Sequence, residues 1–226
     1  MLDIDGSAIL RKDGLATDDK VWKTLLRLLQ KHRPERPIDG IVLTISATDL
    51  IAPIEEVREV IRAKADTIYK KLIQVQVTLG LCVPVYVLVT KCDAIPGFRS
   101  FAGALPQQFR DQMFGWSNPY ALETAFSPRW VDEAFETVSA NLYETQIELF
   151  STQSFIDNRD ELFMFVSDFE RMLEPARAFI GDIFKQSVYH EQIFFRGMYF
   201  WLFGAEEAAA DLSDRLGPEH LIAPKD

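Results

Sequence analysis

Short runs of apolar and β-branched residues mark the strands that the sequence predicts. The clearest are residues 38–46 (IDGIVLTIS) and residues 83–89 (VPVYVLV), and both are typical of buried strands. A further strand is expected at residues 1–4, another at residues 162–166, and an edge strand near residues 196–203. The two clearest runs are the basis for the rest of the prediction.

Between these runs, apolar residues recur every three or four positions, which is the spacing of one helix face. The expected helices are one that begins after Thr17 and ends before Pro34, and others at residues 54–79, 131–149 and 168–185. Strands that alternate with helices in this way are typical of a parallel sheet with crossover helices. The pattern therefore predicts an α/β fold with a mainly parallel sheet and a helical extension.

The same pattern suggests three regions along the chain. We expect a partial α/β core in residues 1–118 and a helical extension in residues 119–204, which adds a core strand and an edge strand. An acidic tail is expected in residues 205–226.

Charge and composition exclude several classes of protein. The 226 residues carry a formal net charge of -10, whereas nucleic acid and anionic lipid both require a basic surface. The apolar runs are far shorter than the ~20 residues of a membrane span. Cys82 and Cys92 are expected to be buried thiols, and the scattered histidines give no metal site.

Two short motifs lie where an α/β sheet would bind a nucleotide, at the carboxyl ends of expected strands. The first, D-x-x-G, runs from Asp3 to Gly6, where the carboxylate would hold the Mg²⁺ shell and the glycine amide would face the γ-phosphate. The second is T-K-x-D, in which Asp93 would accept hydrogen bonds from a purine edge and the stem of Lys91 would lie along the ring, directly after Thr90. The alternative is that these acids are turn and helix-cap residues.

The sequence has no phosphate-binding loop, because none of its 11 glycines is followed by lysine. It also has no G-x-S-x-G element, so no catalytic residue is assigned. The aromatic residues of segment 194–203 are expected to form packed core, with a docking surface as the alternative.

The longer segments resemble the IcmF/TssM family of type VI secretion inner-membrane components. They are LDIDG, KHRPERPIDG, VTKCDAIPGF, FGWS and FFRGMYF, and the resemblance runs from residue 1 to about Gly204. The resemblance implies a small-GTPase-like P-loop fold in a membrane-anchored protein, at the cytoplasmic face of the bacterial inner membrane. It also implies contacts with a TssL/DotU-like protein and with baseplate components. Asp3, Gly6, Thr90, Lys91 and Asp93 correspond to the nucleotide-motif positions of that family.

This chain differs from the family pattern, because it lacks the phosphate loop and the membrane anchors. We therefore expect a fragment, or a degenerate product, that lacks the first strand of the fold. The resulting open sheet edge beside residues 1–4 predicts marginal stability or self-association.

Three functions follow from these observations. The first is a structural module that acts through protein contacts. The second is a switch that binds GTP or ATP with Mg²⁺, with its Walker A loop upstream of this chain. The third is an unrelated α/β domain with accidental motifs.

Overall fold

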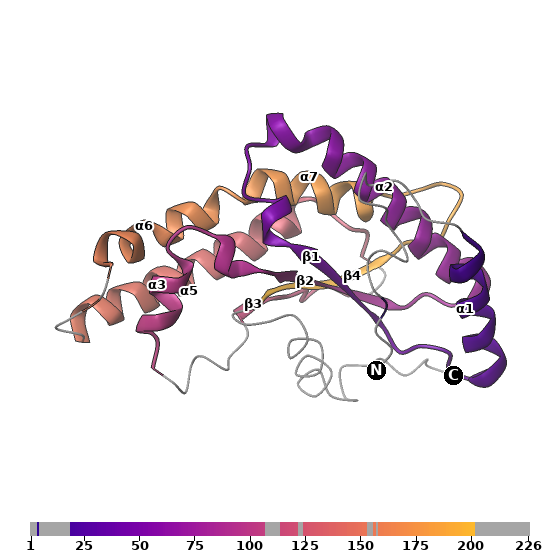
Figure 1. Ribbon diagram of the computed structural model, residues 1–226. Coiled ribbons are helices and arrows are strands. Elements are labelled where there is room, and N and C mark those ends of the chain that lie inside the picture. Colours follow the sequence, from indigo (N-terminus) through magenta and orange to yellow (C-terminus); the bar gives the residue numbers. More distant parts are fainter. Residues whose placement is uncertain are drawn as a thin grey trace.

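The computed structural model describes residues 19–106, 114–121, 124–152 and 158–201, together with Ile4 and Ile156. In that part of the chain, four strands form one sheet, and helices pack against it (Figure 1). The strands are β1 (Ile41–Ser46), β2 (Pro84–Thr90), β3 (Phe114–Ser117) and β4 (Phe194–Phe200). The helices are α1 (Asp19–His32), α2 (Ile54–Leu79), α3 (Phe98–Ala104), α5 (Arg129–Thr152), α6 (Arg159–Glu170) and α7 (Leu173–Ile183).

The strand order is β1-β2-β4-β3, with β1, β2 and β4 parallel and β3 antiparallel to β4. The predicted α/β fold with a mainly parallel sheet is therefore confirmed. The runs at residues 38–46 and 83–89 form β1 and β2, as expected. The strand expected at residues 1–4 lies outside the described residues except for Ile4, which is not in a strand.

The strand predicted at residues 162–166 is wrong, because this segment lies inside α6. The buried side chains of α6 are Leu162, Phe165, Val166 and Phe169, which is the spacing of a helix face. A short apolar run cannot by itself distinguish a buried strand from a buried helix. Here the acids Asp160 and Glu161 in the first turn favour the helix, since they face its positive dipole end.

The helix predicted at residues 168–185 is divided between α6 and α7, which are separated by Arg171 and Met172. Pro175 lies in the first turn of α7. Proline is accepted there because the amides of the first turn have no partner within the helix, whereas in the middle of a longer helix it would break a hydrogen bond.

The expected edge strand near residues 196–203 is an interior strand, β4, which pairs with β2 on one side and β3 on the other. The prediction of an edge was wrong because β3 was not anticipated. The segment FGWS has only four residues, one of them a glycine, which is too short to establish a strand period.

Both faces of the sheet are apolar, and successive side chains of β2 point to opposite faces. Val85, Val87 and Val89 belong to the main core together with side chains of α2, α3, α5, α6 and α7. Tyr86 and Leu88 point to the opposite face, where they cluster with Tyr199 and Trp201. Figure 1 shows α2 and α7 on the same side of the sheet. Of the aromatic residues of β4, Phe195, Tyr199 and Phe200 are buried, which confirms the prediction of packed core for them, whereas Phe194 is only partly buried.

The helix α2, with 26 residues, is the longest element in the described part of the chain. Glu55 and Glu56 occupy its first turn, and Gly80 ends it in the left-handed conformation with a hydrogen bond from its N–H to Gln76 O. One face packs on the sheet and on α7, and its last turns hold Trp22 and Leu26 of α1 in a smaller apolar cluster.

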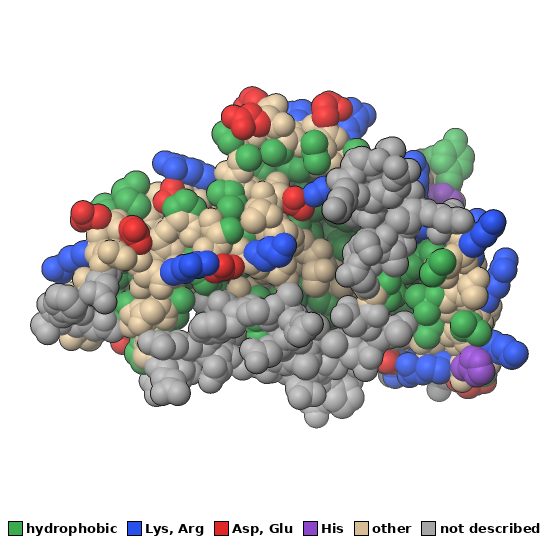
Figure 2. All heavy atoms as spheres, viewed as in Figure 1, with side chains coloured by type: hydrophobic (Ala, Val, Ile, Leu, Met, Phe, Trp, Pro, Cys, Tyr) green, Lys and Arg blue, Asp and Glu red, His purple; other side chains and the backbone are tan. Residues whose placement is uncertain are grey.

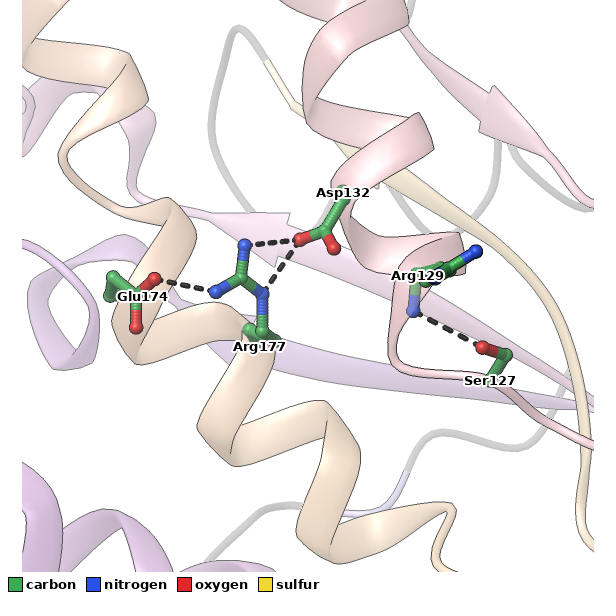
Figure 3. A network of polar contacts seen from close by, with 5 residues as sticks. All are labelled: Ser127, Arg129, Asp132, Glu174 and Arg177. Atoms are coloured by element: carbon green, nitrogen blue, oxygen red, sulfur yellow. Dashed lines mark hydrogen bonds and ion pairs between the residues drawn. The ribbon is translucent and has the colours of Figure 1, made fainter.

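A charged group joins α7 to the start of α5 (Figure 3). The Arg177 guanidinium donates from Nε and Nη2 to Asp132 Oδ1 at 2.6 and 2.5 Å, and from Nη1 to Glu174 at 2.5 Å. The hydrogen bond to Asp132 raises the pKa of Arg177. The Ser127 hydroxyl accepts from the Arg129 N–H at the first turn of α5. The arrangement positions two helices that are distant in sequence.

Gly97 sits where a side chain has no room, between α3 and α6. Its φ is +74°, and a Cβ placed on it would clash with Glu161 O and lie 3.0 Å from the Phe165 Cβ. Around it, the Phe165 ring packs against Phe98 and Phe101 with centroids 5.7 and 4.7 Å apart.

Replacing Gly97 with alanine is expected to lower the free energy of unfolding by about 2–4 kcal/mol, because it adds backbone strain and a steric clash. Chemical denaturation monitored by circular dichroism measures the change. The matched control is Gly103→Ala within α3, where a Cβ meets nothing within 4 Å. That variant should be neutral or more stable by up to about 1 kcal/mol. Equal effects of the two substitutions would contradict this explanation.

Candidate functional site

The carboxyl ends of β1 and β2 lie side by side and bring the T-K-C-D motif to one edge of the sheet. Ser46 is the register partner of Thr90, so the two strands end at the same level. Each strand continues into a short 3-10 turn, η2 (Ala47–Asp49) after β1 and η3 (Cys92–Ala94) after β2. We call the residues from Ser46 to Asp49 and from Thr90 to Asp93 the carboxyl edge.

Thr90 faces inward at this edge. Its side chain is buried, and its hydroxyl lies 3.4 Å from Ile45 O as a hydrogen-bond donor. The residue therefore fastens β2 to β1 and does not extend into solvent.

Lys91 has the opposite environment. It is exposed, and its backbone is in the left-handed conformation with φ of 56°. A non-glycine residue there costs roughly 1 kcal/mol. The conformation is held by η3, in which the Ala94 N–H donates to Lys91 O at 3.0 Å. This turn directs the chain away from the sheet and places Asp93 at the surface.

Asp93 is exposed and is paired within the chain. Its Oδ2 accepts a hydrogen bond from Arg99 Nη2 of α3 at 2.9 Å, and the two side chains are 52% and 80% exposed. An ion pair so open to water contributes little to stability, typically below ~1 kcal/mol. The carboxylate is therefore held in place, and a competing donor could displace the guanidinium at small cost.

The neighbouring strand repeats this arrangement, and the sequence prediction missed it. Asp49 follows Ser46 by three positions, as Asp93 follows Thr90, and it accepts a hydrogen bond from Lys64 Nζ of α2 at 2.7 Å. The Ser46 hydroxyl is hydrogen-bonded to the Thr48 hydroxyl at 2.7 Å and accepts from the Thr48 N–H. The signal that could have found the pair is the shared spacing, S-A-T-D and T-K-C-D, directly after two buried strands.

The two cysteines differ in environment. Cys92 is buried, as expected, and its thiol donates to Val89 O at 3.4 Å. Burial raises its pKa to about 12, although a backbone hydrogen bond from Trp201 acts in the opposite direction. The folded chain thus holds the thiol proton more tightly, and this contribution to stability is lost as the pH rises toward about 12.

The expectation that both thiols are buried is wrong for Cys82, which is only partly covered. Its thiol donates to Glu191 Oε2 at 2.7 Å. The pKa of Cys82 is raised to about 12, and partial burial is the largest cause. The hydrogen bond to the Glu191 carboxylate and the negative charge of that carboxylate act in the same direction.

The remaining predicted site residues, Asp3 and Gly6, lie outside the described residues. The structure therefore brings together Thr90, Lys91 and Asp93 and does not place the D-x-x-G element. Within the described ranges, no group of three or more His, Cys, Asp or Glu side chains is arranged to hold a metal ion. None of the helices in the described ranges has the length and apolar character of a membrane span.

The Glu191 contact predicts an increase in thiol reactivity when its charge is removed. In Glu191→Gln the pKa of Cys82 should fall, so its reaction with a thiol reagent near pH ~8.5 should become several-fold faster. Quenched labelling and mass spectrometry of the two cysteine peptides measure the rates. Cys92 serves as the internal control and should stay unreactive, and an unchanged rate at Cys82 would contradict the assignment.

The comparisons with known proteins agree on one family. The model of the IcmF-related N-terminal domain matches residues 16–223. The type VI secretion system component TssM1 of Pseudomonas aeruginosa is 30% identical over 208 residues, which cover 88% of this chain and 18% of that protein. The chain thus spans about a fifth of the length of this relative, and no solved structure matches it. With a match to the model over nearly its whole length, the chain belongs to the IcmF-related family.

Proposed function

We propose that the chain is a structural interaction module of a type VI secretion membrane complex, at the cytoplasmic face of the inner membrane, and that it acts through protein contacts. The observation that carries the proposal is the state of the carboxyl edge. The Thr90 hydroxyl is bonded to Ile45, and the Asp93 carboxylate is paired with Arg99, so both are engaged within the chain. Family membership supports a place in the secretion machinery.

We also infer that the fold is of the P-loop, small-GTPase-like type. Supporting this, three parallel strands lie side by side, and the T-K-C-D motif follows the middle one. Open α/β sheets bind ligands at the carboxyl ends of such strands. This inference concerns the fold alone. A fold of this type is compatible with an interaction module and with a nucleotide switch.

The second candidate function is a nucleotide switch, and the exposure of Asp93 is the observation that favours it. A carboxylate that is half exposed and held by an open ion pair is accessible to a purine edge. In this alternative GTP or ATP would bind with Mg²⁺. Asp3 and Gly6 would serve the metal and the γ-phosphate, and the Walker A loop would lie upstream of this chain.

The proposed partners are a TssL/DotU-like inner-membrane protein and baseplate components. They rest on the family resemblance, because a domain of a secretion component has to be joined to the rest of the machine. The chain offers exposed apolar side chains on α2, Val60 and Val77, for such contacts.

Calorimetric titration with GTP and with ATP, each with Mg²⁺, separates the two functions. For an interaction module we expect no saturable binding up to about 1 mM, since the sequence has no phosphate-binding loop to hold the triphosphate. Saturable micromolar binding would contradict this expectation.

Two variants identify the site if binding does occur. In the switch alternative Asp93→Ala should weaken binding about tenfold or more, because a charge-assisted hydrogen bond to the base is lost. The matched control is Asp49→Ala, which removes the equivalent acid from the neighbouring strand end and should leave the affinity unchanged.

The interaction function predicts direct binding to purified partner domains. The immobilised chain should retain the cytoplasmic part of the TssL/DotU-like protein, or a baseplate component, from the same bacterium, and added GTP should not change the amount retained. The heat-unfolded chain is the control. Failure to retain any of these proteins would overturn the proposal, whatever the nucleotide result.

A further inference from the structure

The outer surface of the α5–α6 pair carries exposed apolar side chains that no described element covers. Ile147 and Phe163 are 67% and 65% exposed, and Tyr143 is 39% exposed. The two helices are fastened beneath them, because buried Gln146 donates from Nε2 to Leu162 O and Phe163 O at 2.5 and 3.1 Å. The apolar side chains are thus held on a fixed base.

The charge around these side chains is strongly negative. Residues 129–170 contain ten Asp and Glu against two Lys and Arg, which accounts for most of the net charge of -10. Glu144 and Glu148 lie on the same stretch of α5 as Ile147, are exposed, and make no ion pair with the described residues. We call Tyr143, Glu144, Ile147, Glu148 and Phe163 the acidic α5–α6 surface.

A surface of complementary chemistry lies on α1. Val21 and Leu28, two helical turns apart and therefore on one side, are 68% and 48% exposed. Residues 19–36 contain six Lys and Arg against two acids, and Arg27 and Lys31 are exposed. We call Val21, Arg27, Leu28 and Lys31 the basic α1 surface.

The two surfaces lie too far apart to meet within one molecule. Figure 1 places α1 at one end of the molecule and the α5–α6 pair at the other. In Figure 2 the blue Lys and Arg side chains line the edge that α1 forms. A contact between these surfaces therefore requires a second molecule.

We propose that a second copy of this chain docks its basic α1 surface on the acidic α5–α6 surface. Each surface combines apolar side chains with charged side chains of one sign, and the charges on the two surfaces are opposite. Burial of the apolar side chains and pairing of the charges therefore favour the same contact. The contact joins two different surfaces and therefore repeats from copy to copy as a ring or a filament. Repulsion between two chains of net charge -10 opposes the association and keeps it weak.

Sedimentation velocity over a range of chain concentrations tests this contact. At about 50 mM NaCl we expect concentration-dependent association, which about 500 mM NaCl weakens several-fold because the charges are screened. Glu144→Lys/Glu148→Lys and Arg27→Glu/Lys31→Glu should each weaken association about tenfold or more. An equal mixture of the two variants should associate again, since each then presents the charge that the other needs.

A third variant controls for overall charge. Glu55→Lys/Glu56→Lys changes the net charge as much as the α5 variant does, but on exposed positions of α2, and should not weaken association. A chain that stays monomeric at low salt would overturn the proposal. Association that neither surface variant weakens would also overturn it, and so would a mixture of the two variants that does not associate. Circular dichroism establishes that each variant is folded.

This inference rests on the protein-contact function proposed above and names two surfaces for it. The two proposals are tested by different experiments, so either can be wrong without the other. Retention of the secretion partners tests that function, whereas self-association of the chain tests the α1 and α5–α6 surfaces.

Discussion

The pairing of β2 with a parallel neighbour on each side is the constraint on which the rest of the structure depends. A parallel strand in the middle of a sheet must be covered on both faces, and β2 is apolar on both. Val85, Val87 and Val89 require the helices of the main core, while Tyr86 and Leu88 require the aromatic side chains of β4 and Trp201. The same pairing brings the ends of β1 and β2 to one level, and so decides where the carboxyl edge lies.

At the carboxyl edge, β1 and β2 end with the same local structure. A chain that leaves a buried strand has to return its backbone to water, and here each strand does so through a hydroxyl residue, a 3-10 turn and an aspartate. The aspartate is then paired with a cation of the next helix, Lys64 in one case and Arg99 in the other. This repetition gives the T-K-C-D sequence a structural explanation that needs no ligand, so the same residues can be understood as a family motif or as a turn.

Sequence reasoning located α2 and α5, whose apolar pattern is long and periodic, and β1 and β2, whose apolar runs are rich in β-branched residues. It failed where the pattern is short or where tertiary contacts decide. Residues 162–166 are apolar at every position, so only their neighbours in space distinguish helix from strand. The strand β3 has too few residues to show a period and exists through its pairing with β4, which in turn made β4 an interior strand. Of the site, T-K-C-D was visible as a motif. The ion pairs Asp93–Arg99 and Asp49–Lys64 were not, because each joins residues of two different elements.

The length of α2 has a mechanical consequence. An unbroken helix of 26 residues is about 39 Å long and bends only gently. Near its middle Lys64 is paired with Asp49 in the turn after β1, and near its end Val75 and Leu79 contact Trp22 and Leu26 of α1. A pull on α1 therefore reaches the turn after β1 through a stiff rod, with no loop between them to absorb the strain. The second half of α2 is thus a direct mechanical link between α1 and the carboxyl edge.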